Sequence, residues 1–318
     1  MADATTQIVT ALSRALRRNA AACAAESRQA RRGGTGAVHR LRVASRRLRA
    51  AVPLAAKPAG IATVDVLREL RRMTRAFGVV RELDVARELL AAFAARDPWA
   101  ASALASVDDH CAALRKRALE TARKRLSHDE ALLLRSHVDA LADRVLARNR
   151  GRETTLTLLA DVGRRARDVS VAMDHAGTVY GLESLHRVRI ASKKLRYTLE
   201  LAGGVLGPAS ERTAVRVLKR LQARLGAIHD MQVAQQHLRT VASAPDTGIA
   251  FGADLARVDQ EMEIQCRRLH AQMVRRKPEV EGIVVALRRD IARRVGMRDL
   301  RRPVRMRTAS VRRTRAAS

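Results

Sequence analysis

Aromatic side chains are scarce in this sequence, since they make up only 2% of its 318 residues. The hydrophobic fraction is nevertheless 47%. Alanine, leucine and valine must therefore form the interior, as they do in close-packed helical bundles. The few aromatic residues form no platform on which the bases of a single-stranded nucleic acid would stack.

Cysteines are also few and widely spaced. No CxxC pair occurs among Cys23, Cys111 and Cys266, which argues against a disulfide framework or a zinc cluster. We expect the three cysteines to be buried and to pack as small apolar side chains. The sequence has no run of about 18 uninterrupted apolar residues and no charged leader followed by an apolar block. These absences predict a cytoplasmic protein that does not enter a membrane.

Acidic residues are too few to balance the basic ones. The chain has 62 Lys and Arg residues against 32 Asp and Glu, which gives a formal net charge of +30 at pH 7. Self-repulsion of this size opposes compaction and indicates a polyanionic partner. Only seven of the cationic residues are lysines, and the guanidinium group suits phosphate oxygens better than an ammonium does. A GC-rich genome would also favour arginine over lysine, but it would not produce the net charge.

Catalytic signatures are absent as well. The sequence contains no GxxxxGK[ST] phosphate loop, no HExxH motif, no GxSxG motif and no ExExK motif. We therefore expect a protein without catalytic activity and without a cofactor.

Apolar residues recur at spacings of three and four through most of the chain, which predicts an all-α fold. Glycine and proline divide the pattern into helices. The predicted interruptions lie at 31–36, 57–60, 97–98, 149–151, 203–208, 244–248 and 277–278.

Parts of the first half of the chain recur in the second half. VHRLRVASRRLRAAV at 38–52 is nearly repeated by LHRVRIASKKLRYTL at 185–199. Two further pairs follow in the same order, 67–86 with 217–234 and 115–125 with 267–277. This order predicts an internal duplication. We expect two four-helix bundles of long helices, 1–150 and 151–296, followed by a disordered arginine-rich tail at 297–318.

The repeated stretch presents a cationic face. A helical residue turns by about 100°, so four cationic residues of the first copy fall within an arc of roughly 80°. They are His39, Arg42, Arg46 and Arg49, and their counterparts are His186, Arg189, Lys193 and Arg196. The opposite side is apolar and can enter a core: Leu41, Ala44, Leu48, Ala51 and Val52 in the first copy, and Val188, Leu195 and Leu199 in the second.

A second cationic strip follows each repeated helix. It consists of Arg68, Arg71, Arg72 and Arg75 in the first half, and of Arg216, Lys219 and Arg220 in the second. A solvated helix face is the usual explanation of such a run. However, neither copy of the repeated stretch contains an acidic residue, and like charges at helical spacing are destabilising unless a ligand neutralises them. We therefore expect the four strips to line one groove.

With these motifs, the sequence resembles the conserved histidine α-helical domain, or CHAD, family. The resemblance depends on HRLRVASRRLR from His39 and HRVRIASKKLRY from His186, and covers about residues 1–296. It implies two bundles related by a pseudo-twofold axis that bind inorganic polyphosphate on a basic surface, often on intracellular polyphosphate granules. It also implies binding roles for the eight repeated cationic residues named above. The sequence departs slightly from the family pattern of Arg-Asp and Asn-Asp after the matched glycines, because it has Arg81-Glu82 and His229-Asp230 there. A helix cap or a partner for arginine is the role expected of the two acids.

Other ligands and roles remain open at this point. DNA binding through backbone phosphates is the alternative function, because counterion release requires only cations. A metal site is disfavoured because His39 and His186 both lie among cations. A buried, structural role for these two histidines is the alternative to ligand contact.

Overall fold

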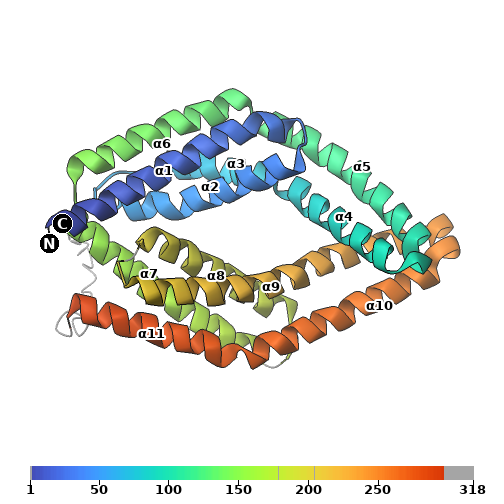
Figure 1. The fold of residues 1–318 in the computed structure, drawn as a ribbon. Helices are drawn as coiled ribbons and strands as arrows, with labels where there is room; N and C mark the ends of the chain where they lie inside the picture. The colour runs from blue at the N-terminus through green and yellow to red at the C-terminus, as the bar shows by residue number, and fades with distance from the viewer. Residues whose placement is uncertain (1, 178, 204, 297–318) are drawn as a thin grey trace, which may run out of the picture.

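The computed structural model describes residues 2–177, 179–203 and 205–296, and the predicted tail at 297–318 lies outside this range. The all-α prediction is confirmed, because the described residues form helices and no strand. The helices are α1 (Ala2–Arg31), α2 (Thr35–Ala56), α3 (Val64–Ala76), α4 (Gly78–Arg96), α5 (Ala101–Arg125), α6 (His128–Arg148), α7 (Gly151–Ala176), α8 (Leu182–Ala202), α9 (Pro208–Ala242), α10 (Pro245–Arg275) and α11 (Lys277–Val295), with a short 3-10 helix at Pro98–Ala100 (Figure 1).

Each predicted interruption lies at or directly beside a break between helices, whereas the breaks between α3 and α4, between α5 and α6 and between α7 and α8 were not predicted. Gly33, between α1 and α2, has a φ of +94°, which favours glycine because a Cβ is strained there. Asn149 ends α6 in the left-handed conformation, which Asn tolerates better than most residues. Prolines occupy the first turn of α9, α10 and α11, where their missing N–H would have had no partner in the helix.

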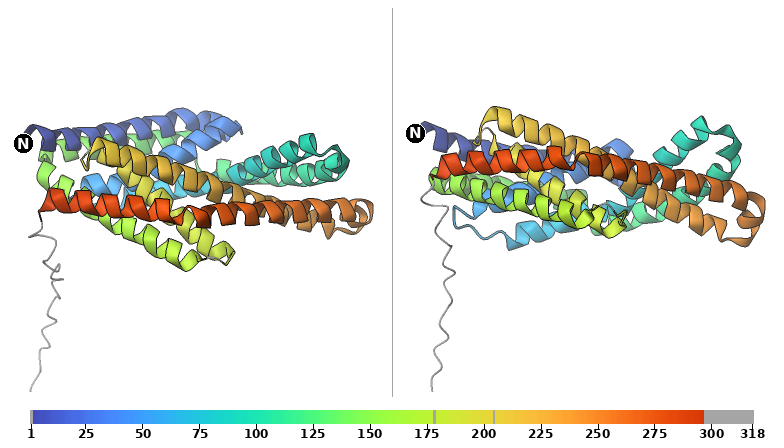
Figure 2. Two further views of the ribbon diagram at one scale, coloured as in Figure 1. Left: turned by 60° about the horizontal axis from the view of Figure 1, so that its bottom comes forward. Right: turned by 90° about the horizontal axis from the view of Figure 1, so that it is seen from below.

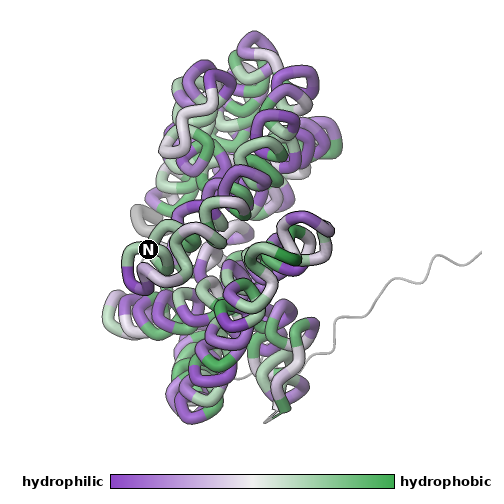
Figure 3. The backbone as a smooth tube through the Cα atoms, turned by 90° about the vertical axis from the view of Figure 1, so that its right-hand side faces the viewer, coloured by the Kyte–Doolittle hydropathy of each residue, from purple (hydrophilic) through white to green (hydrophobic). Residues whose placement is uncertain are grey.

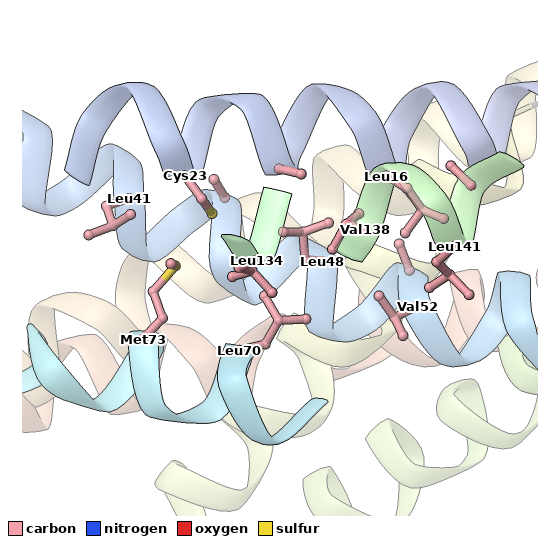
Figure 4. Close-up of a cluster of buried hydrophobic side chains, with 14 of the residues drawn as sticks. Leu16, Cys23, Leu41, Leu48, Val52, Leu70, Met73, Leu134, Val138 and Leu141 are labelled. Atoms are coloured by element: carbon pink, nitrogen blue, oxygen red, sulfur yellow. The ribbon is translucent and has the colours of Figure 1, made fainter. Parts of the chain in front are cut away.

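Three buried apolar clusters hold the helices together. The first joins α1, α2, α3 and α6, and Figure 4 shows Leu16, Leu48, Leu70 and Leu134 of these four helices pointing toward one another. The second joins α7, α8, α11 and the first part of α9, together with the end of α10. The first cluster also includes the end of α5 and the second draws on five helices, so neither is confined to four helices. All three cysteines are buried, as predicted.

The third cluster is made from both halves of the chain and was not predicted. It combines α4 and α5 with the second part of α9 and the first part of α10. These four helices form the end of the elongated molecule opposite the N-terminus (Figure 2). The division into 1–150 and 151–296 stays a prediction, and the two parts share this core.

The repeated helices lie next to each other at the junction of the halves. Helix α2 contacts α8, α7 and α4, and α8 contacts α9 and α1. Along the helices of the molecule, hydrophilic and hydrophobic residues alternate (Figure 3), as expected when one face of a helix is buried and the other is polar. None of the described helices combines the length and the hydropathy that a membrane span requires.

The two halves differ where α3 meets α4. Helix α9 runs unbroken through Gly226, but the first half changes helix between Ala76 and Gly78. At this break Arg42 of α2 donates a hydrogen bond from Nη1 to the Thr74 carbonyl over 2.6 Å. A Cβ at Gly78 would lie 3.3 Å from the same Nη1 atom, whereas one at Gly226 would meet nothing within 4 Å. The Arg42 guanidinium thus satisfies a carbonyl at the end of α3.

Candidate functional site

The two faces of the repeated helices are placed largely as their spacing predicts. All eight residues expected in the core are buried. Of the cationic residues, His39, Arg49 and His186 are exposed, and Arg46, Arg189, Lys193 and Arg196 are half-buried. Arg42 departs from the expected open strip, because it is 7% exposed and is bonded to the Thr74 carbonyl. Burial, followed by the nearby charge of Arg46, lowers its pKa to about 10.

Three of these residues form what we call the central cationic cluster: Arg46 from α2, and Arg189 and Lys193 from α8. Burial, Arg189 and Arg46 lower the pKa of Lys193 to about 7. Burial also lowers the pKa of Arg189, and the charge of Arg46 lowers it further. Within the described part of the chain, none of these three residues forms an ion pair, defined by an N–O distance of at most 4.0 Å. Positive groups from both halves therefore repel one another here.

Two acids lie beside this cluster without pairing with it. Glu82 and Asp230 both raise the pKa of Arg189 by their negative charge. Burial raises the pKa of Asp230 itself, although Arg189 and Lys193 act in the opposite direction. Neither acid is a helix cap, because Glu82 follows Phe77, the cap of α4, by five residues and Asp230 lies within α9. They are electrostatic partners of arginine.

The histidines of the two strips are on the surface. Both His39 and His186 are exposed, which excludes the buried, structural role. Burial and the charge of Arg81 lower the pKa of His39, in the direction expected for an imidazole among cations. His186 lies 6.2 Å from the ring of His229, measured between centroids. Together with Arg189, these two histidines line a cavity of about 290 Å³.

His229 and Arg81 also lie at the candidate site and were not among the predicted binding residues. Burial and Arg189 lower the pKa of His229 to about 4, so the imidazole is neutral near pH 7. Arg81 lowers the pKa of both His39 and Arg42. The two residues occupy matching positions in the second repeated stretch, 148 residues apart. Their matching positions in the repeat could have identified both residues from the sequence.

The second strips are divided between ion pairs and free cations. Arg72 pairs with Glu130 at the start of α6 over 2.7 Å, and its counterpart Arg220 pairs with Glu279 at the start of α11 over 3.3 Å. Arg68 pairs with Asp65 over 3.1 Å on the surface. The remaining members have no ion pair in the described part of the chain: Arg71, Arg75, Arg216 and Lys219.

The free residues of the first half extend the central cationic cluster. Burial is the largest cause of the lowered pKa of Arg49, and the charges of Arg71, Arg46 and Arg75 lower it further. The cationic surface therefore continues from α2 onto α3. Among the described residues, no three His, Cys, Asp or Glu side chains are grouped so that they would hold a metal ion.

Comparison with known proteins agrees with the resemblance seen in the repeated motifs. The CHAD domain family matches residues 14–239. The chain belongs to the CHAD family. This family is generally associated with polyphosphate binding, and its members are generally binding domains without catalytic activity.

Two individual proteins are similar to the chain. An uncharacterized protein, MT2285, of Mycobacterium tuberculosis (strain CDC 1551 / Oshkosh) is 27% identical over 265 residues, covering 73% of this chain and 48% of the relative. The chain thus spans about half the length of this curated relative. The crystal structure of the CHAD domain from the plant Ricinus communis matches with a TM-score of 0.53 and 21% identity, covering 91% of each chain. At this identity the likeness establishes the fold alone.

Proposed function

We propose that this chain binds inorganic polyphosphate, without catalysis, on the basic surface where the two repeated helices meet. The central cationic cluster is the observation that carries the proposal. Its three cations come from both halves, and burial together with the charges of Arg189 and Arg46 lowers the pKa of Lys193 to about 7. A bound anion would relieve the repulsion between these charges, and a cluster without ion pairs has its hydrogen-bond donors available.

The extent of the basic surface supports a polymeric ligand. Arg49, Arg71 and Arg75 continue it on one side of the central cationic cluster, and the exposed residues Arg216 and Lys219 of α9 add unpaired cations in the second half. The strip from His39 to Arg49 alone spans about 15 Å along α2. A repeating phosphate chain can contact such a surface at many points, and recognition requires no base-reading groups.

Several finer assignments belong to this proposal. The binding residues are His39, Arg46, Arg49, His186, Arg189 and Lys193, with support from Arg71, Arg75, Arg216 and Lys219. Arg42 and Arg72 stabilise the fold and do not contact the ligand, because Arg42 is hydrogen-bonded to the Thr74 carbonyl and Arg72 is paired with Glu130. We place the protein in the cytoplasm on polyphosphate granules, where a ligand of this kind is concentrated.

Competition between polyanions tests the proposal. Long-chain polyphosphate, pyrophosphate, duplex DNA and single-stranded DNA are compared at equal phosphate concentration, at about 0.15 M salt and again at higher salt. We expect polyphosphate to displace DNA at far lower concentration and to keep its advantage as salt rises. Equal competition by DNA at every salt concentration would show that the surface binds polyanions without preference.

A further inference from the structure

A separate cavity lies between α1, α2 and α8, where the two halves meet. Its volume is about 430 Å³, within the range of small-molecule sites. The polar lining includes Arg14 and Arg18 from α1, Arg47 from α2, and Tyr197 and Glu200 from α8. Alanine and leucine side chains complete the wall. The cavity thus combines cations, an aromatic ring, a carboxylate and apolar surface.

The cations of this cavity are available to an anion. Arg14 and Arg18 lie one turn apart on α1, are exposed, and have no ion pair in the part of the chain that the structure describes. Arg47 has only a long contact, 3.7 Å from its Nη2 to Oε2 of Glu200. Three guanidinium groups with free donors, from two helices, can bind phosphate oxygens.

Glu200 distinguishes this cavity from the central cationic cluster, which has no ion-paired acid. Its Oε1 accepts a hydrogen bond from Arg196 Nη1 over 2.9 Å, so the carboxylate is held in place. A ligand made only of phosphates would be repelled by this carboxylate. A ligand that carries hydroxyl or amino donors beside its phosphates would instead donate hydrogen bonds to it.

Tyr197 supplies a surface for a flat ring. The guanidinium of Arg196 lies over one face of the Tyr197 ring, 4.8 Å from its centroid, which leaves the opposite face for a base. The Tyr197 hydroxyl has no hydrogen bond to any other described residue. In the first copy of the repeat, Ala50 and Pro53 stand where the second has Tyr197 and Glu200. The aromatic ring and the carboxylate therefore lie outside the duplicated cationic pattern.

From this geometry we propose that the cavity is a nucleotide-binding site. Arg14, Arg18 and Arg47 bind the phosphates, Tyr197 stacks on the base, and Glu200 accepts hydrogen bonds from hydroxyl or amino groups of the nucleoside. This inference does not rest on polyphosphate binding, because the residues proposed to contact the nucleotide are separate from the central cationic cluster. Arg196, which holds Tyr197 and Glu200, is the one link to the repeated strip.

The test measures binding of ATP and of tripolyphosphate to the full chain by isothermal titration calorimetry at about 0.15 M salt. We expect Arg14→Ala with Arg18→Ala to weaken ATP binding about tenfold or more. The matched control is Arg28→Ala with Arg32→Ala, an exposed pair with the same spacing near the other end of α1, which should leave ATP binding unchanged. Circular dichroism verifies that each variant is folded.

Two further variants separate a nucleotide site from a simple phosphate site. Tyr197→Leu should weaken ATP binding about tenfold and leave tripolyphosphate binding unchanged, because only ATP has a base to stack. Glu200→Gln should improve tripolyphosphate binding more than ATP binding. The proposal is overturned if ATP does not bind at millimolar concentration, if ATP and tripolyphosphate respond alike to every variant, or if Arg46→Glu abolishes ATP binding and the cavity variants do not affect it.

Discussion

Residues of the same type have different roles in the two copies of the motif. Arg42 and Arg189 occupy equivalent positions, but Arg42 is buried and bonded to a carbonyl, whereas Arg189 remains half-buried without an acidic partner. Helical spacing predicted the face on which each residue lies. It did not predict whether a side chain would form an ion pair or hydrogen bond within the protein, because partners such as Glu130 for Arg72 are distant in the sequence.

The lowered pKa of Lys193 gives binding a pH dependence. In the free protein this pKa is about 7, so the ammonium group loses its proton as pH rises through neutrality. Bound polyphosphate stabilises the charged form and raises the pKa, so binding takes up a proton in the interval between the free and the bound value. We expect affinity for long-chain polyphosphate to fall between pH 6.5 and 8.5, by at most about tenfold per pH unit for one proton.

Substitutions at neighbouring lysines check this assignment. Lys193→Arg should flatten the pH profile, because arginine stays charged throughout the interval. Lys194→Arg is the matched control, since Lys194 is exposed and adjacent, and it should keep the wild-type profile. Long chains minimise the contribution of terminal phosphates, which titrate near neutral pH. If affinity falls with pH equally steeply in the wild type and in Lys193→Arg, Lys193 does not cause the pH dependence.

At the scale of elements, the sequence predicted where most helices end but not how they combine. Glycine and proline marked seven of the breaks, and the breaks between α5 and α6 and between α7 and α8 were missed. The break before Gly78 was missed because the matching helix continues through Gly226, and the difference depends on a tertiary contact from Arg42. The third cluster was missed because apolar periodicity identifies a buried face and does not identify the helix that covers it.

The α3–α4 break predicts a difference in stability between equivalent arginines. Arg42→Ala leaves the buried Thr74 carbonyl without its charged donor, and we expect it to lower the free energy of unfolding by about 2 kcal/mol more than Arg189→Ala does. Both substitutions remove one charge from the same cationic region, so the comparison isolates the hydrogen bond. Urea denaturation provides the measurement. Equal effects of the two substitutions would show that the contact does not stabilise the break.

At the scale of the whole molecule, we propose that the excess of positive charge serves polyphosphate binding at the junction of the halves. The net charge of +30 predicted a polyanionic partner from composition alone. The sequence also predicted that α2 and α8 would contribute together. The structure adds that these helices are in contact and that Arg46 of one acts electrostatically on Lys193 of the other. One polyphosphate chain bound across this junction is the central claim.

Charge reversal in each half tests this claim most directly. Arg46→Glu and Arg189→Glu are compared singly and together, with Lys116→Glu and Arg268→Glu as controls, which are exposed counterparts in another repeated stretch and lie far from the site in sequence. Affinity for long-chain polyphosphate is measured at about 0.15 M salt. We predict that each site variant loses about tenfold or more in affinity, to a similar extent, while the controls lose little. Unchanged affinity after reversal in either half would contradict a surface shared by both.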